Sequence, residues 1–106
     1  MRITKIVVGN NFTNCYLIKL DNKGIIIDPG AEPEKIEKEF NNELTIEYII
    51  NTHGHFDHIA GNKYLKEKTR AKIGVHKKAK TLLLDPKKNL SSYLGNEENV
   101  ISPQAD

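Results

Sequence analysis

Runs of hydrophobic residues along the 106-residue chain predict a β-sheet of five strands. Residues 1–8 alternate between hydrophobic and polar positions, which is typical of a half-buried first strand. Ile25-Ile26-Ile27 and Tyr48-Ile49-Ile50 are continuous hydrophobic runs instead, and strands of that kind are usually covered on both faces. The predicted strands lie near residues 2–8, 14–20, 24–28, 46–51 and 72–75.

Helices are predicted after the third, fourth and fifth strands. Pro33 suits the first turn of a helix, and Ile36 and Phe40 lie one turn apart, so both are expected to face inward. Asp21-Asn22 is turn chemistry between two strands that are well placed to form a hairpin. The predicted helices cover about residues 33–41, 58–69 and 77–84.

The composition limits which class of protein this chain can belong to. The chain makes one domain, 1–106, large enough in principle to bury a core, although 38% of its residues are hydrophobic, 28% are charged and Trp is absent. Its single Cys15 excludes an internal disulfide and is interpreted as a buried core thiol rather than a reactive one. No signal peptide or membrane span is visible, so we expect a cytoplasmic protein without membrane contact.

Three of the four histidines lie within six residues, in the run Thr52-His53-Gly54-His55-Phe56-Asp57-His58. Imidazole and carboxylate are ligands that zinc, iron and manganese share. A hydrophobic core is a poor place for these groups, because each buried polar group without a partner costs roughly 1–3 kcal/mol. A turn would ordinarily use Gly, Asn, Asp and Ser rather than His. The cluster therefore predicts a metal site.

The spacing in the cluster favours two metal ions over one. The cluster begins where the predicted fourth strand ends, which is where open α/β sheets tend to place their sites. His53 and His55 are two residues apart, so they project to the same side of an extended segment. Asp57 and His58 lead into the predicted helix, and Asp57 is a candidate N-cap for it.

The run His53-x-His55-x-Asp57-His58, followed by Ile59-Ala60-Gly61-Asn62, resembles the signature of the metallo-β-lactamase superfamily and of its small glyoxalase II-like hydrolases. Residues 14–18, 24–30 and 73–76 resemble family segments in the expected order. The resemblance implies an α/β fold (α+β in some schemes). It is that of the N-terminal half of an αββα sandwich, with a mixed sheet and flanking helices.

The resemblance also implies a site. His53 and His55 would bind one metal, and Asp57 and His58 a second, with zinc expected and iron or manganese possible. Metal lowers the pKa of bound water from about 15.7 to about 7, so hydroxide could attack a carbonyl carbon, with Asp57 orienting it or taking a proton. Asp28 and Thr52 would support the ligands from behind, as such partners fix ligand orientation. Asp28 could instead only bond the backbone two residues on, as in a turn.

Several ligands of the family's full site have no counterpart in this chain. The family adds a later histidine for the first metal, and a bridging aspartate and a further histidine for the second. After His58 the chain has only His76, Asp85 and Asp106 to offer. We interpret His76 as a helix-start or supporting residue, Asp85 as a turn or cap before Pro86, and Asp106 as terminal. The site is therefore expected to be incomplete in this chain alone.

The chain is about half as long as is normal for the family, which suggests a truncated product, a fragment or a natural half-length form. In half of such a sandwich, the sheet face that should meet the other half would be bare, and a patch of that kind usually marks an interface. We therefore expect the chain to form a homo-oligomer, with a second copy replacing the absent half, or to bind a complementary chain.

Three functions remain open. The first is a metal-dependent hydrolase that acts on a small-molecule thioester, ester or lactone. The second is a non-catalytic metal-binding half-domain that needs a partner chain. The third is a nucleic-acid-processing hydrolase, because Lys63–Lys80 holds eight Lys or Arg against one Glu. A net charge of only +2 and the lack of an aromatic ladder favour a solvated helix face for that stretch, so nucleic acid is not the expected partner.

Overall fold

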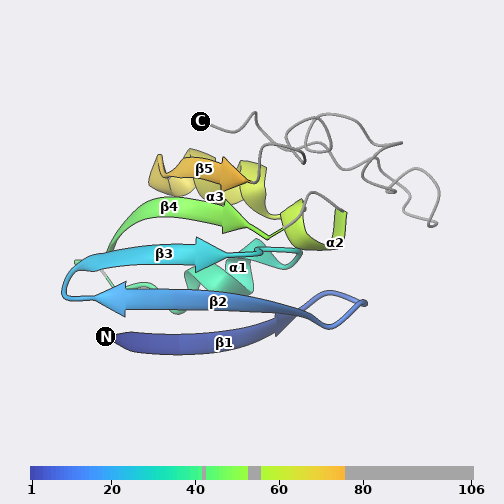
Figure 1. The fold of residues 1–106 in the computed structure, drawn as a ribbon, viewed down its shortest axis with the longest axis horizontal. Coiled ribbons are helices and arrows are strands. Elements are labelled where there is room, and N and C mark those ends of the chain that lie inside the picture. The colour runs from blue at the N-terminus through green and yellow to red at the C-terminus, as the bar shows by residue number, and fades with distance from the viewer. Residues whose placement is uncertain (42, 53–55, 76–106) are drawn as a thin grey trace.

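A single five-stranded sheet forms the centre of the protein (Figure 1). The computed structural model describes residues 1–41, 43–52 and 56–75, and for Phe56 and Asp57 it describes the backbone alone. The strands lie side by side in the order of the chain: β1 (Arg2–Val8), β2 (Thr13–Leu20), β3 (Lys23–Ile27), β4 (Thr45–Asn51) and β5 (Lys72–Val75). All five coincide with the predicted strands to within one residue at each end.

The sheet is mixed, as expected. β1, β2 and β3 form two antiparallel hairpins, with the turn at Asp21-Asn22 where it was predicted. β3, β4 and β5 are parallel. Parallel neighbours require crossover connections, and helices α1 (Pro33–Glu37), α2 (Phe56–Ile59) and α3 (Asn62–Thr69) supply them. The arrowheads of β3, β4 and β5 consequently point to one edge of the sheet, beside α2 (Figure 1).

The core lies between one face of the sheet and helices α1 and α3. Each strand contributes alternate side chains to it, and Ile36 of α1 and Leu65 of α3 meet them from the other side. Cys15 is completely buried in this core, which confirms its interpretation as a core thiol. The fully buried aliphatic residues of the sheet are Leu17, Ile26 and Ile49, with Ile6, Val8, Ile46 and Ile73 almost fully buried.

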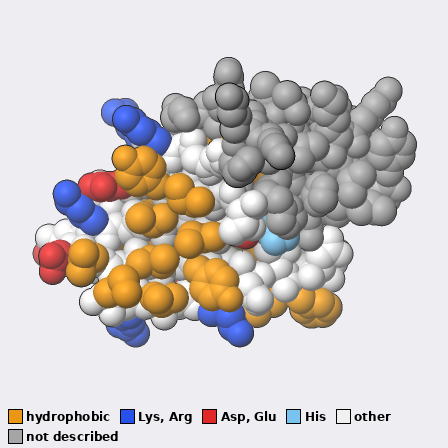
Figure 2. Space-filling model, in the orientation of Figure 1, with side chains coloured by type: hydrophobic (Ala, Val, Ile, Leu, Met, Phe, Trp, Pro, Cys, Tyr) orange, Lys and Arg blue, Asp and Glu red, His pale blue; other side chains and the backbone are white. Residues whose placement is uncertain are grey.

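The opposite face of the sheet is also hydrophobic, and neither α1 nor α3 packs on it. Ile3, Ile18, Ile25 and Tyr48 lie directly opposite one another across four adjacent strands. Figure 2 shows hydrophobic side chains gathered over the strands on this side. Ile3 and Tyr48 are 57% and 41% exposed, and Leu20 at the end of β2 is 59% exposed. These residues are called the exposed sheet face below.

The helices differ from their predicted bounds. The helix predicted over 33–41 ends at Glu37, although Glu39 and Phe40 continue the turn with bonds to the carbonyls three residues earlier. The helix predicted over 58–69 is two helices, α2 and α3. Asp57 lies inside α2, so its prediction as an N-cap was wrong. The helix predicted over 77–84 lies outside the described residues.

Gly61 explains the break between α2 and α3. Its N–H donates to the Pro29 carbonyl oxygen at 2.6 Å, which brings the two backbones into direct contact. A Cβ at position 61 would lie 2.6 Å from the same oxygen, closer than real Cβ atoms come. The chain therefore leaves the helical path at Ala60-Gly61 so that the turn after β3 can pack against it.

No helix in the described part of the chain is long and apolar enough to cross a membrane.

We predict that Gly61→Ala lowers the free energy of unfolding by about 1–3 kcal/mol, because the added methyl group overpacks a rigid backbone contact. Urea denaturation of the purified chain measures this difference. Gly74→Ala is the matched control, because its Cβ would meet only the tip of the Ile50 side chain, at 3.0 Å. Equal losses in the two variants would contradict the importance of the Gly61–Pro29 contact.

Candidate metal centre

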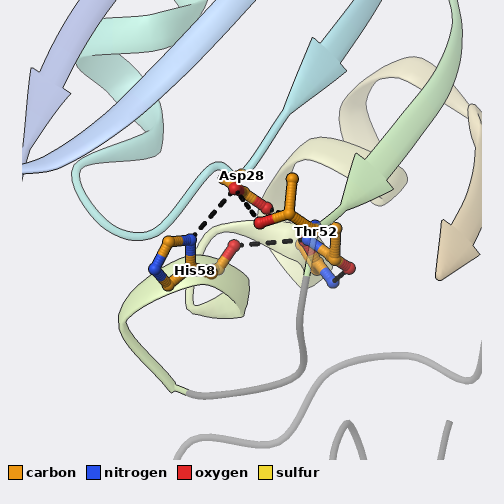
Figure 3. A network of polar contacts seen from close by, with 5 residues as sticks. Asp28, Thr52 and His58 are labelled. Carbon is orange, nitrogen blue, oxygen red and sulfur yellow. Dashed lines mark hydrogen bonds and ion pairs between the residues drawn. The ribbon is translucent and has the colours of Figure 1, made fainter. Parts of the chain in front are cut away.

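The candidate site lies where β3 and β4 end. Ile27 pairs with Ile50 in the parallel ladder, so the residues that follow the two strands emerge side by side. The N–H of Asp28 extends this pairing by donating to the Ile50 carbonyl oxygen at 2.9 Å. Thr52 leaves β4 beside it, and α2 returns His58 to the same place (Figure 3). Asp28 thus meets Thr52, 24 residues later in the sequence, and His58 in the following helix at one edge of the sheet.

Asp28 is the centre of this group and is 5% exposed. Its Oδ1 accepts the Thr52 backbone N–H at 2.7 Å, and its Oδ2 accepts the Thr52 hydroxyl at 2.5 Å. The same Oδ2 lies 3.0 Å from Nδ1 of His58. Thr52 thus contacts Asp28, and Asp28 contacts His58, whereas the support of a metal ligand by these two residues stays a prediction.

The turn interpretation of Asp28 was only half correct. A bond does join residues 28 and 30, but it runs from the Gly30 N–H to the Asp28 main-chain carbonyl, at 2.8 Å. The side chain is left to contact Thr52 and His58. Asp28 also has a φ of 55°, in the left-handed region where Asp and Asn are among the better-tolerated side chains. The turn thus aims the carboxylate at the end of β4.

The ring of His58 faces the Asp28 carboxylate with Nδ1. Nδ1 lies 3.0 Å from the Asp28 carboxylate, within ion-pair distance, although the two groups are not aligned as a hydrogen bond. A carboxylate on this side of the ring favours the neutral tautomer that carries its proton on Nδ1 and its lone pair on Nε2. Metal-binding histidines commonly present one nitrogen to the ion and donate from the other to a carboxylate. The donor chemistry at this position therefore fits a divalent metal such as zinc or iron.

Cys15 lies under the same site but cannot serve as a ligand or a nucleophile in its resting state. Burial, with a further contribution from the negative charge of Asp28, raises the pKa of the Cys15 thiol to about 12. The thiolate is the form that attacks and binds metal, and it is scarcely populated at neutral pH with such a pKa. Asp28 and Cys15 therefore have separate tasks, one in the site and one in the core.

The other predicted ligands, and the three later residues judged unlikely to be ligands, lie outside what the structure describes. His53, His55, His76, Asp85 and Asp106 fall among the residues that are not described, and Asp57 is placed by its backbone alone. In the described ranges, no group of three or more His, Cys, Asp or Glu side chains is arranged to hold a metal. The metal-ligand set thus stays a prediction.

Sequence reasoning assigned no function to Asn51 and Asn62. Asn51 is the last residue of β4 and Asn62 the first of α3, and they are 2% and 0% exposed. They bond to each other, and Asn51 also donates to the His58 carbonyl oxygen. The available signal was a polar residue at the end of an otherwise hydrophobic strand, which does not reveal its partner eleven residues later.

The chain matches a family model described as the metallo-beta-lactamase superfamily over residues 8–105. It is similar to a probable metallo-hydrolase, YqgX, of Bacillus subtilis, with 33% identity over 104 residues, covering 97% of this chain and 49% of that protein. It is also similar to the cytoplasmic isozyme of hydroxyacylglutathione hydrolase of Saccharomyces cerevisiae, with 35% identity over 95 residues, 79% of this chain and 35% of that enzyme. The chain thus spans half or less of these relatives.

Solved structures give the same relationship. The chain superimposes on the BLEG-1 B3 metallo-beta-lactamase with a TM-score of 0.90 and 31% identity, over 99% of this chain and 51% of that one. TTHA1623, solved in a di-iron-bound form, gives a TM-score of 0.74 and 26% identity, over 97% of this chain and 50% of that one. The fold expected from the sequence, half of a metallo-β-lactamase-type domain, is confirmed.

We predict that Asp28→Asn lowers the free energy of unfolding by about 2–3 kcal/mol. The reason is that one carboxylate oxygen is replaced by an NH₂ group, a donor, on a side chain that faces the donor groups of Thr52 and His58. Urea denaturation in the presence of a chelator measures this loss without any metal contribution. Asp21→Asn in the exposed β2–β3 hairpin is the matched control and should change stability by less than about 0.5 kcal/mol. A loss at Asp21 as large as at Asp28 would contradict the prediction.

Proposed function

The chain belongs to the metallo-β-lactamase superfamily, and from this premise we propose that it is a metal-dependent hydrolase that cleaves a thioester, ester or lactone. The observation that carries the proposal is the contact of the buried Asp28 carboxylate with Nδ1 of His58. This contact supports the proposal because a histidine that faces a carboxylate with one nitrogen commonly presents the other nitrogen to a metal.

The proposed ligands are His53 and His55 for one ion, and Asp57 and His58 for a second. Zinc is the expected metal, with iron or manganese as alternatives that the same ligand set accepts. When bound, such ions act as Lewis acids and lower the pKa of water into the physiological range. The chain's own residues do the rest. Asp28 and Thr52 hold His58 in one orientation, and Asp57 accepts a proton from the attacking water.

The proposed substrate class follows from what the relatives are named for. Hydroxyacylglutathione hydrolases of Saccharomyces cerevisiae and Pelagibacter ubique match this chain at 35% and 36% identity. Their names denote hydrolysis of a thioester, whereas the BLEG-1 structure is named as a β-lactamase. All of these substrates share an acyl carbon that water must attack. A thioester is the first choice, because the named curated relatives include several such hydrolases.

The lysines described in the basic stretch Lys63–Lys80 give little support to the alternative of a nucleic-acid-processing hydrolase. Nζ of Lys66 donates to the Ala71 carbonyl oxygen at 3.2 Å, closing the end of its own helix. Lys68 lies over the ring of Tyr64, 5.5 Å from its centroid. These lysines therefore make local contacts within α3, as expected of a solvated helix face.

We predict that the zinc-loaded protein, with the ligands that this chain lacks supplied by another chain, hydrolyses a hydroxyacylglutathione thioester. His55→Ala should lower turnover by at least about 100-fold, since loss of a ligand removes the Lewis acid. Release of the thiol, followed by a colorimetric reagent, measures the rate. His76→Ala is the matched control and should retain activity, because His76 is not among the proposed ligands. A wild-type chain that binds zinc without turnover would favour the alternative of a non-catalytic metal-binding half-domain.

The proposal includes a second copy of the chain packed on the exposed sheet face. Five strands about 4.8 Å apart, each with about six residues of about 3.3 Å, give a face on the order of 500 Å². Two copies would then bury about 1,000 Å² in total, the lower bound for a specific interface. Such an interface requires a hydrophobic centre. The row of side chains across the four strands would supply it: Ile3, Ile18, Ile25 and Tyr48.

We predict that the chain sediments as a dimer and that Tyr48→Glu makes it monomeric at the same concentration, because the charge would be buried in the interface. Sedimentation equilibrium measures both states. Lys63→Glu on the exposed side of α3 is the control for a change of charge and should leave the dimer intact. A monomeric wild-type chain would contradict self-association and leave a complementary chain as the partner to look for.

A further inference from the structure

A reciprocal amide pair closes the connection between β4 and α3. Nδ2 of Asn62 donates to Oδ1 of Asn51 at 2.8 Å, and Nδ2 of Asn51 donates back to Oδ1 of Asn62 at 3.2 Å. Asn51 is 2% exposed and Asn62 is completely buried. The pair therefore ties the last residue of a strand to the first residue of a helix, and the segment that carries His58 lies between them.

Asn51 has a third contact that reaches His58 itself. Its Nδ2 donates to the His58 main-chain carbonyl oxygen at 3.2 Å. An asparagine amide carries two N–H donors, so one can serve Asn62 and the other His58. His58 is thus held at two points: its backbone by Asn51, and its ring by the contact of Nδ1 with Asp28.

The residue types at these positions are costly for a packing role alone. Burying an amide without a partner costs roughly 1–3 kcal/mol on mutational scales, and aliphatic side chains would fill the same space without that penalty. The described residues include four buried polar or charged side chains: Thr13, Asp28, Asn51 and Asn62. Asp28 and Asn51 contact His58, and Asn62 bonds to Asn51. Directional contacts, which aliphatic side chains lack, distinguish this corner from the rest of the core.

We propose that Asn51 and Asn62 are positioning residues that hold the backbone of His58, so that its ring meets Asp28 through Nδ1 and presents Nε2 to a metal. The last clause rests on the proposed function, whereas the positioning itself exists without metal. Neither asparagine needs to touch an ion or a substrate. Both act through the one ligand that they place.

The metal-free test reads the tautomer of the His58 ring. Long-range ¹H–¹⁵N NMR of the ¹⁵N-labelled chain, with a chelator present and at a pH where the ring is neutral, distinguishes a proton on Nδ1 from one on Nε2. The wild-type chain should show a single tautomer with the proton on Nδ1. Asn62→Leu and Asn51→Leu, which keep the side-chain size but remove both amide groups, should shift the ring to a mixture of tautomers.

Thr69→Val is the matched control at the other end of α3. It removes a hydroxyl that donates to the Leu65 carbonyl oxygen at 2.6 Å and accepts the Ala71 N–H at 3.2 Å, and it should leave the His58 tautomer unchanged. If the leucine variants do not fold, Asn62→Asp, which keeps an acceptor for Asn51 but loses the donor, gives the same comparison. Folded asparagine variants with a wild-type tautomer would overturn the proposal.

A measurement of zinc affinity separates this inference from the proposed function. Competition with a chromophoric chelator should show Zn²⁺ affinity reduced about 10–100-fold in the asparagine variants and unchanged in Thr69→Val. Unchanged affinity in the asparagine variants would overturn their positioning of a ligand. A wild-type chain that binds no Zn²⁺ would refute the proposed function instead, and the tautomer measurement would still decide whether the asparagines position His58.

Discussion

The carboxylate of Asp28 is the constraint on which the rest of this corner depends. A carboxylate that is 5% exposed must be surrounded by donors, because an uncompensated buried charge costs several kcal/mol. Thr52 supplies two donors and His58 a third group within 3.0 Å. Since these partners follow β4 and lie in α2, the charge can be satisfied only if both segments return to the end of β3. The polar contact therefore selects one arrangement of the loops.

The parallel part of the sheet makes that arrangement accessible. β3 and β4 run in the same direction, so Asp28 and Thr52 leave neighbouring strands at the same edge. The close approach of Gly61 to Pro29 then fixes where the return segment crosses the turn that carries Asp28. Local backbone geometry and the buried charge thus reinforce each other, and neither requires a long helix.

The sequence predicted the strands well because their signal is local. Alternation and continuous hydrophobic runs reflect which faces are buried, and no distant partner is needed to recognise them. The helix break at Ala60-Gly61 depends on Pro29, some thirty residues earlier, and so it has no local signature. The Asn51–Asn62 pair was missed for the same reason. The histidine cluster predicted metal chemistry because its residue types are rare together. The family resemblance suggested Asp28 and Thr52 as its support, whereas the contact of Asn51 with the His58 backbone could only be seen in three dimensions.

The contacts described for the Asp28 group join residues between 28 and 62, within β3, β4 and the start of the helices. These contacts to His58 therefore come from a short part of a chain that spans only about half of its relatives. If His58 binds a metal as proposed, the remaining ligands would join a histidine whose ring and backbone already have partners. Orientation in advance lowers the cost of ordering when further ligands arrive, which is the physical basis of preorganised sites.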